Sequence, residues 1–248
     1  MAEEVRSIIK NDAWTTVDKS SQNSSVGSQF ILRNKYIPDG TLQRRKARIV
    51  TQGFAQRLGI DFFESFAPVA RLGSIRLMTA LAAQHGMIIR QFDVSTTYLN
   101  AALEEDVYIR VPEHFEEALE QVVRGEANAS IRKRATKMLR DLRTGDKVFH
   151  LKKALYGLRQ ARRSWYKTLD RELKSLGAEP TNADPCIYRI ERGEGSTIIA
   201  IYVGDILIAA QKSDDINRVR DHLSKHFEVN DLGDVGCCLG IEFTSKGR

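Results

Sequence analysis

Residues 198–209 read IIAIYVGDILIA, two apolar runs on either side of a Gly-Asp dipeptide. Short apolar runs rich in β-branched side chains are typical of buried strands. Gly-Asp is a favoured two-residue connection in β-hairpins, and the glycine is expected to supply the positive φ that such turns require. The segment therefore predicts a hairpin that carries Asp205 at its tip.

A second aspartate lies near the end of another apolar segment. Residues 88–94 have the composition of a strand, and Asp93 is the next-to-last residue of it. Its carboxylate is expected to face Asp205 from a neighbouring strand. Carboxylate oxygens are the ligands that Mg²⁺ prefers, and two-metal nucleotidyl transfer needs such groups. The simpler interpretations also stand: Asp93 as a cap of the following turn and Asp205 as a turn residue.

Periodic patterns predict further helices and strands along the chain. The helices are expected at 75–85, 164–176 and 214–227, and the strands at 30–36, 47–54, 88–94, 186–191, 196–203, 206–210 and 239–244. Ser74 is expected at or near the N-cap of the first helix. Because strands and helices do not alternate regularly, the predicted class is α+β.

The composition is that of an ordinary globular protein with a weakly basic balance. Its 248 residues include 38 Lys and Arg against 32 Asp and Glu, a net charge of +6 that is mild support for a polyanionic partner. Three cysteines make neither a disulfide framework nor a zinc motif. The N-terminus lacks a signal-peptide layout and no apolar stretch is long enough to span a bilayer, so a soluble intracellular protein is expected.

The stretch from 124 to 147 is strongly basic and carries an apolar stripe. This pattern predicts one amphipathic helix that ends near Gly145. Its charges are either the solvated face of a helix packed on the body or a phosphate-contacting face. Basic faces on surface helices are common, so the solvated face is favoured.

Several short motifs occur in order over nearly the whole chain. They are residues 3–14, KARIVTQGF at 46–54, FAPVAR at 66–71, QFDVSTTYLN at 91–100, LEEDVY at 103–108, LKKALYGLRQA at 151–161, Trp165-Tyr166, ADP at 183–185, YVGD at 202–205 and LGIE at 239–242. Together they resemble the reverse transcriptase domain of copia-type LTR retrotransposons. The resemblance implies a right-hand polymerase with fingers and palm, the palm being an antiparallel sheet backed by helices. Its implied ligands are an RNA template, a DNA primer, dNTP and two Mg²⁺ ions.

The resemblance also implies a division of the chain. Residues 1–88 correspond to the N-terminal part of the fingers, and 89–104 to the first metal-site segment of the palm. Residues 105–163 return to the fingers with an extended basic helical insertion at about 116–147. Residues 164–248 complete the palm with the metal-site hairpin and the start of a primer-grip region. Thumb and RNase H are not matched, so the chain is expected to be a piece of a polyprotein that assembles in cytoplasmic virus-like particles.

The resemblance assigns the metal site to Asp93, Asp205 and the backbone carbonyl of Val94. The family hairpin reads Tyr-Val-Asp-Asp, and Gly204 occupies the first of its two aspartate positions. Glycine supplies neither an oxygen ligand nor a negative charge, and loss of a catalytic charge costs orders of magnitude in rate. This departure predicts an impaired polymerase.

Four residues are assigned to the incoming nucleotide by the same resemblance. Tyr98 falls at the aromatic steric gate that excludes a ribose 2′-OH. Gln160 matches the glutamine that lies against the nucleotide. Lys46 and Arg48 match basic finger residues that contact its triphosphate.

Three hypotheses follow for this copy. The first is an active RNA-directed DNA polymerase, which needs a replacement ligand such as Asp184 or Glu242, although no sequence signal places either at the site. The second is a non-catalytic nucleic-acid-binding remnant or domesticated module that keeps the basic fingers. The third is a decayed genomic copy without a selected role. Gly204 argues against the first.

Overall fold

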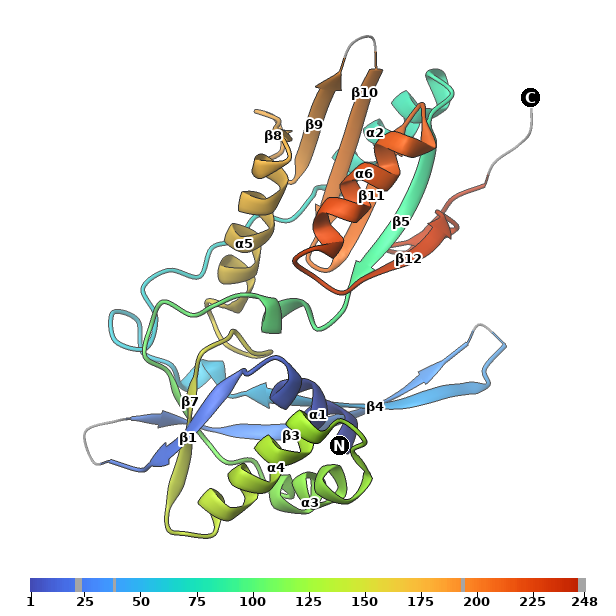
Figure 1. The fold of residues 1–248 in the computed structure, drawn as a ribbon. Coiled ribbons are helices and arrows are strands. Elements are labelled where there is room, and N and C mark those ends of the chain that lie inside the picture. The colour runs from blue at the N-terminus through green and yellow to red at the C-terminus, as the bar shows by residue number, and fades with distance from the viewer. Residues whose placement is uncertain (21–23, 38, 193–194, 245–248) are drawn as a thin grey trace. The chain divides into compact units, whose positions relative to one another are not determined.

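The computed structural model describes residues 1–20, 24–37, 39–192 and 195–244. The chain divides into two compact units, each made of two separate segments. Unit 1 comprises Met1–Phe66 and Tyr98–Trp165, and unit 2 comprises Ala67–Thr97 and Tyr166–Arg248. Helices are mixed with mainly antiparallel sheets (Figure 1), which confirms the α+β prediction.

Unit 2 is built on a six-stranded antiparallel sheet with the order β12-β5-β11-β10-β9-β8 (Figure 1). Its strands are β5 (Ile88–Val94), β8 (Glu179–Pro180), β9 (Ile187–Arg192), β10 (Gly195–Tyr202), β11 (Asp205–Ala210) and β12 (Val229–Asp234). The predicted hairpin is formed by β10 and β11, and β5 lies beside β11. The strand predicted at 239–244 is only the short β14 (Ile241–Glu242), paired with β13 (Cys237–Cys238).

Three helices accompany this sheet: α2 (Leu72–Gln84), α5 (Ala161–Ser175) and α6 (Ser213–Ser224). All five residues of 206–210 in β11 are buried. Because successive side chains of a strand point to opposite faces, both faces of β11 are covered. Helices α2 and α6 both contact β11, so the sheet is backed by helices at the strand that carries Asp205.

The start of α2 depends on a carboxylate from a distant part of the chain. The N-cap is Arg71, and Ser74 lies in the first turn three residues later, so the helix begins slightly earlier than predicted. Asp184, only 2% exposed, accepts hydrogen bonds from Arg71 N (2.9 Å), Ser74 Oγ (2.7 Å) and Cys186 N (3.0 Å). Burial by itself raises the pKa of Asp184, but these hydrogen bonds outweigh it and leave the pKa below its usual value.

Unit 1 combines a four-stranded sheet, a long hairpin and three α-helices. The sheet order is β1-β7-β6-β2, with β1 (Trp14–Asp18), β2 (Ser25–Val26), β6 (Tyr108–Arg110) and β7 (Lys147–Leu151). The hairpin is β3 (Ser28–Tyr36) and β4 (Leu42–Thr51), and the helices are α1 (Ala2–Lys10), α3 (Phe115–Gly125) and α4 (Ala129–Leu142). Two 3-10 helices, η1 (Gly53–Ala55) and η2 (Thr97–Asn100), complete the chain's described helical segments. No helix within the described ranges has the length and apolar character to cross a membrane.

The basic stretch from 124 to 147 forms one helix, as its periodicity predicts, but this helix, α4, is shorter than the stretch and spans Ala129–Leu142. Helix α3 ends at Gly125, and α4 begins after Asn128. The Asn128 Oδ1 accepts hydrogen bonds from Ser130 N (3.0 Å) and Ile131 N (3.2 Å), which satisfies donors of the first turn. This cap sets the start of α4.

We predict that Asp184→Ala destabilises the protein by about 2–4 kcal/mol, because two donors at the start of α2 and the Cys186 N–H before β9 lose a charged acceptor. Urea unfolding measures the difference in the free energy of unfolding between the two proteins.

Since the pKa of Asp184 is lowered by folding, its stabilisation is complete above the usual value of 3.8 and is lost as the pH falls through the lower folded value. Asp234→Ala, at an exposed carboxylate of β12, is the control and is expected to change stability by less than about 0.5 kcal/mol. Equal effects of the two variants would contradict the capping role.

Candidate metal centre and nucleotide site

The two aspartates predicted to face each other are direct partners across β5 and β11. Asp205 is paired with Asp93 in the antiparallel register, and Val94 N donates to Gly204 O at 2.9 Å. Residues directly opposite each other on adjacent strands share a face, with Cβ atoms about 4.5–5.5 Å apart. The pairing thus places both carboxylates on one face of the sheet. Gln91, two residues before Asp93, brings its Nε2 to 3.5 Å from Asp205 Oδ1.

The turn between β10 and β11 differs from the predicted one. Tyr202 pairs with Asp205, so the two-residue loop is Val203-Gly204 and not Gly-Asp. Val203 has a φ of 59°, whereas Gly204 is not among the residues with positive φ. The prediction that glycine supplies the positive φ is therefore wrong. Positive φ is costly for a β-branched residue, so the hairpin holds its tip under local backbone strain.

The space beside Gly204 is occupied by a neighbouring side chain. A Cβ at this position would lie 2.6 Å from Thr97 Oγ1, 3.5 Å from Val94 O and 3.7 Å from Asp93 Oδ1. A side chain at position 204 would thus start beside Asp93 and collide with Thr97. Thr97 is buried and donates its hydroxyl to Val94 O at 2.9 Å. Thr97 Oγ1 thus occupies the space in which a side chain at position 204 would begin, and it also engages the carbonyl predicted to face a metal.

The residues present do not fit a full two-ion site. Within the described ranges, no third His, Cys, Asp or Glu lies with Asp93 and Asp205 in reach of a single ion. The carboxylate of Asp184 is held by its three hydrogen-bond donors, and Glu242 is an exposed residue of β14. Neither of the two candidate replacement ligands is placed with the aspartate pair.

The buried thiol of Cys238 lies in the surroundings of Asp205. Burial raises its pKa to about 11, and the negative charge of Asp205 adds to the effect. The thiolate is the form of cysteine that binds metals. Cys238 is therefore a neutral thiol at neutral pH, and sulfur is not a ligand that Mg²⁺ prefers.

In unit 1, two of the residues predicted to bind the nucleotide meet at one aromatic ring. The guanidinium of Arg48 lies 4.4 Å from the centroid of the Tyr156 ring. Tyr98 packs edge-on against the same ring at 4.7 Å, and Tyr98 is 8% exposed. Tyr156 was not singled out by the sequence, although it lies inside the LKKALYGLRQA motif.

Gln160 is held inside unit 1 by other polar groups. It is 1% exposed, its Oε1 accepts from Gln56 Nε2 at 3.1 Å, and its Nε2 donates to Asp61 O at 3.1 Å. Gln56 Oε1 in turn accepts from Arg159 N at 2.8 Å. The amide predicted to lie against a nucleotide is thus fixed by hydrogen bonds to its own unit.

Two glycines explain how distant motifs come together in unit 1. A Cβ on Gly53 would lie 1.9 Å from Gly157 O, and a Cβ on Gly157 would lie 2.1 Å from Thr51 O. Gly157 also has a φ of +93°, which side chains rarely adopt. Thr51 N donates to Tyr156 O at 2.8 Å. The motifs at 46–54 and 151–161 therefore contact each other through their backbones.

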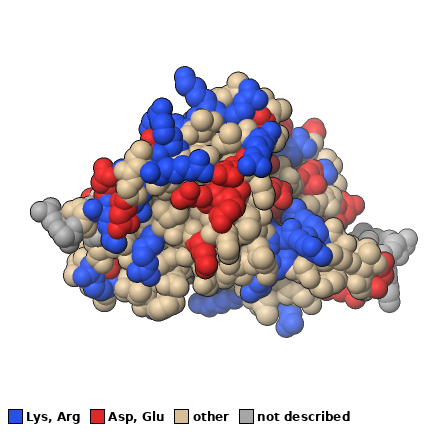
Figure 2. Space-filling model, turned by 90° about the horizontal axis from the view of Figure 1, so that it is seen from below, with Lys and Arg blue, Asp and Glu red and all other residues tan. Residues whose placement is uncertain are grey.

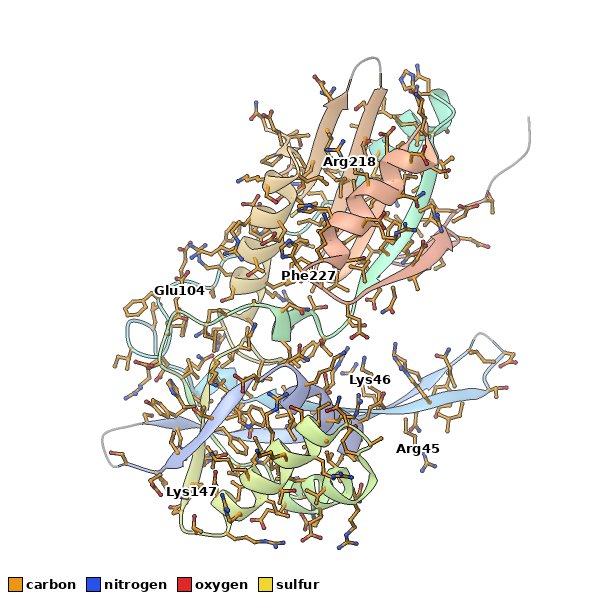
Figure 3. All side chains as sticks on the ribbon, in the orientation of Figure 1. Arg45, Lys46, Glu104, Lys147, Arg218 and Phe227 are labelled. Atoms are coloured by element: carbon orange, nitrogen blue, oxygen red, sulfur yellow. The ribbon has the colours of Figure 1, made fainter. Side chains whose placement is uncertain are left out.

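The hairpin of β3 and β4 concentrates positive charge. Its basic residues are Arg33, Lys35, Arg44, Arg45, Lys46 and Arg48, and Figure 3 marks Arg45 and Lys46 on β4. Between residues 28 and 51 the sequence has one acidic residue, Asp39. Partial burial lowers the pKa of Lys46, and the positive charges of Arg48, Lys35 and Arg44 lower it further. Like charges thus repel one another on this hairpin, and Glu4 offsets part of their effect on Lys46.

The basic residues of α3 and α4 have a different environment. Arg143 pairs with Glu120 (2.5 Å), Arg124 with the same carboxylate (3.2 Å), and Lys137 with Asp141 (3.2 Å). On the face shown in Figure 2, Lys and Arg side chains are interspersed with Asp and Glu. These ion pairs favour the interpretation of a solvated face.

Comparison with known proteins identifies the family. The family model described as reverse transcriptase (RNA-dependent DNA polymerase) matches residues 11–142 and 139–247. The chain belongs to this family, in its copia-type branch.

Three relatives illustrate the similarity. The chain is 35% identical over 247 residues to the retrovirus-related Pol polyprotein from transposon TNT 1-94 of Nicotiana tabacum, covering 99% of this chain and 17% of that protein. It is 33% identical over 243 residues to the corresponding polyprotein from transposon RE1 of Arabidopsis thaliana, covering 98% and 15%. It is 27% identical over 233 residues to the transposon Ty1-MR1 Gag-Pol polyprotein of Saccharomyces cerevisiae, covering 91% and 11%. The chain thus spans less than a fifth of each relative.

We predict that Gly204→Ala destabilises the protein by about 1–3 kcal/mol, because the added methyl group overlaps Thr97 Oγ1. The cost is expected to fall in a Thr97→Ala background, with a coupling of about 1 kcal/mol or more in a double-mutant cycle measured by urea unfolding. Gly73→Ala is the control: its added Cβ has no atom within 4 Å and lies in helix α2, so it is not expected to destabilise. Additive effects of the Gly204 and Thr97 substitutions would show that the two positions do not compete for space.

Proposed function

We propose that this chain is the fingers and palm of an RNA-directed DNA polymerase whose metal centre is closed in this copy. Unit 2, with the facing aspartates, is the proposed palm, and unit 1, with the basic hairpin, the proposed fingers. One observation carries the proposal. Gly204 has no side chain, and the Thr97 hydroxyl occupies the space beside Asp93 in which a side chain would begin. As it stands, the chain is not expected to extend a primer.

The chemistry at stake is two-metal nucleotidyl transfer. When bound, a pair of divalent ions such as Mg²⁺ activates the attacking oxygen and stabilises the leaving oxygen. Asp93 and Asp205 are the proposed ligand residues that remain. Thr97 holds the Val94 carbonyl in a hydrogen bond, so the proposed third oxygen is also engaged. The loss of a carboxylate and the engagement of the Val94 carbonyl are both expected to weaken metal binding.

The proposed role of unit 1 is to bind the incoming dNTP. Lys46 and Arg48 are cations suited to a triphosphate, and Tyr156 holds the guanidinium of Arg48. Tyr98 packs against the same ring, which limits its movement and suits the proposed steric gate. Gln160 is fixed through both ends of its amide and is the proposed support for the nucleotide.

The proposed partners are an RNA template, a DNA primer and the remainder of a Pol polyprotein. The relatives are polyproteins of which the chain covers a small part. In an intact element, we propose that the domain acts within cytoplasmic virus-like particles.

We predict that two substitutions are needed to reopen the metal centre. Gly204→Asp restores the carboxylate but meets Thr97 Oγ1, whereas Gly204→Asp/Thr97→Ala also removes the obstruction. The double variant is expected to bind Mn²⁺ at least about 10-fold more tightly than the unmodified chain in isothermal titration calorimetry, with the single variant between them. Mg²⁺-dependent primer extension on an RNA template is expected from the double variant and not from the unmodified chain.

Asp93→Asn in the double-variant background is the control. It should abolish both the tighter Mn²⁺ binding and the primer extension. Primer extension by the unmodified chain would refute the closed metal centre. Unchanged Mn²⁺ affinity in the double variant would refute the role of Gly204 and Thr97. Tighter Mn²⁺ binding without extension would support the ligand assignment and show that primer extension also needs groups outside this chain.

A second function, non-catalytic binding of nucleic acid, is favoured by the charge of the β3–β4 hairpin. The basic side chains there have one acidic residue among them, and their repulsion adds to the effect of burial in lowering the pKa of Lys46. A phosphate backbone would relieve this repulsion. The function requires no metal ligand, so Gly204 does not affect it.

We predict that Arg44→Ala/Arg45→Ala weakens binding to a fluorescein-labelled RNA–DNA duplex in fluorescence anisotropy. The slope of log affinity against log salt should become shallower by about 0.7–0.9 for each phosphate that the variant no longer neutralises. Arg124→Ala/Lys137→Ala removes the same charge from two cations that are already paired with carboxylates, and it is expected to leave the slope unchanged. Equally weakened binding in the two variants would show that affinity follows net charge and not the hairpin.

A further inference from the structure

Two histidines lie one helical turn apart at the end of α6. His222 is in the last turn of the helix, and His226 follows its last residue, Ser224. The helical turn continues through His226, whose N–H donates to Leu223 O at 3.0 Å. Residues four apart on a helix share a face, and the two imidazole centroids are 5.7 Å apart. Figure 3 marks this end of α6 by Phe227.

A carboxylate from α5 faces both rings. Glu172 Oε2 lies 3.4 Å from His226 Nε2, and the Glu172 side chain is only 13% exposed. The main-chain oxygen of Glu172 lies 3.0 Å from His222 Nε2. Leu173 and Leu223, the neighbours of this cluster in α5 and α6, are fully buried, so both helices are anchored where the three side chains meet.

The local electrostatic field suits a cation. Glu172 lies in the last turn of α5, and His222 in the last turn of α6. The unsatisfied carbonyls at a helix C-terminus carry a partial negative charge, and here two such ends lie beside the cluster. Positive charges are also present: Arg171 Nε is 3.3 Å from Glu172 Oε1, and Arg218, Arg220 and Lys225 line the same hollow as His222. Arg171 thus binds one carboxylate oxygen while the other faces His226.

We infer that Glu172, His222 and His226 form a divalent-metal site for Zn²⁺, separate from the polymerase centre. One ligand atom of each residue lies within 4.8 Å of the others. Two imidazoles and a carboxylate make a nitrogen-rich ligand set that suits Zn²⁺ and not Mg²⁺. Zn²⁺ ligands bound at about 2.1 Å lie roughly 3.4 Å apart in a tetrahedron. Small side-chain rotations bring the ligand atoms from within 4.8 Å of one another to this tetrahedral separation. Water completes the coordination.

Binding exchanges hydrogen bonds for metal bonds without a change in the backbone. His222 Nε2 gives up its contacts with Glu172 O and Ser175 Oγ, at 3.0 and 3.1 Å, and binds the ion as a neutral imidazole. Ser175 Oγ also donates to Glu172 O at 2.8 Å, so that carbonyl keeps a partner. The site then ties the end of α6 to α5 and is expected to stabilise unit 2 by mass action.

Isothermal titration of the tag-free chain with Zn²⁺ tests the inference, together with thermal unfolding in the presence and absence of Zn²⁺. A single saturable ion and a raised unfolding midpoint are expected. His226→Gln, at an exposed side chain, should weaken Zn²⁺ binding by at least about 10-fold, and Glu172→Gln should do the same.

His85→Gln removes an exposed imidazole from the end of α2 and is the matched control, expected to leave the affinity unchanged. Asp205→Asn should also leave it unchanged, because the site is separate from the aspartate pair. Absence of saturable binding would overturn the inference. So would Zn²⁺ binding that survives both His226→Gln and Glu172→Gln, or binding that is abolished in Asp205→Asn.

Discussion

The backbone pairing of β5 with β11 is the interaction on which the candidate catalytic centre depends. It places Asp93 opposite Asp205 and joins Val94 N to Gly204 O. A slip of one residue would move one aspartate to the other face of the sheet. The register is held because the strand that carries Asp205 is buried along its whole apolar length, and a slipped strand would have to rearrange that packing on both faces.

At this pairing, the fold and the proposed activity depend on different atoms. The hairpin is held by backbone hydrogen bonds and by apolar side chains, and neither requires a carboxylate at position 204. A glycine there removes a proposed ligand without removing a structural contact. The Thr97 hydroxyl then occupies the vacated volume and keeps a hydrogen bond to Val94 O. The palm can therefore remain well packed without a carboxylate at position 204.

In unit 1, the family motifs serve packing as much as ligand binding. Gly53 and Gly157 allow two backbones to approach more closely than any side chain would permit. Gln160 is bonded to Gln56 and to Asp61 O, and Tyr156 supports both Arg48 and Tyr98. A motif residue is thus often required for the shape of the fingers, whether or not it also contacts a nucleotide. Packing of this kind needs no metal ion, so it is compatible with the proposed closure of the metal centre.

The sequence by itself determined the family, the α+β class, the strand at 88–94 and the hairpin that follows residue 198. These follow from local composition and from ordered motifs, which do not depend on distant contacts. Tertiary structure alone decided that Val203 takes the positive φ, that Thr97 fills the space at Gly204 and that Asp184 caps a helix 113 residues away in sequence from its carboxylate. It also set where the helix in the basic stretch begins and ends, and it brought Glu172 to His222 and His226. The physical reason is that strand register and side-chain packing join residues far apart in the chain, and local periodicity carries no information about such pairs.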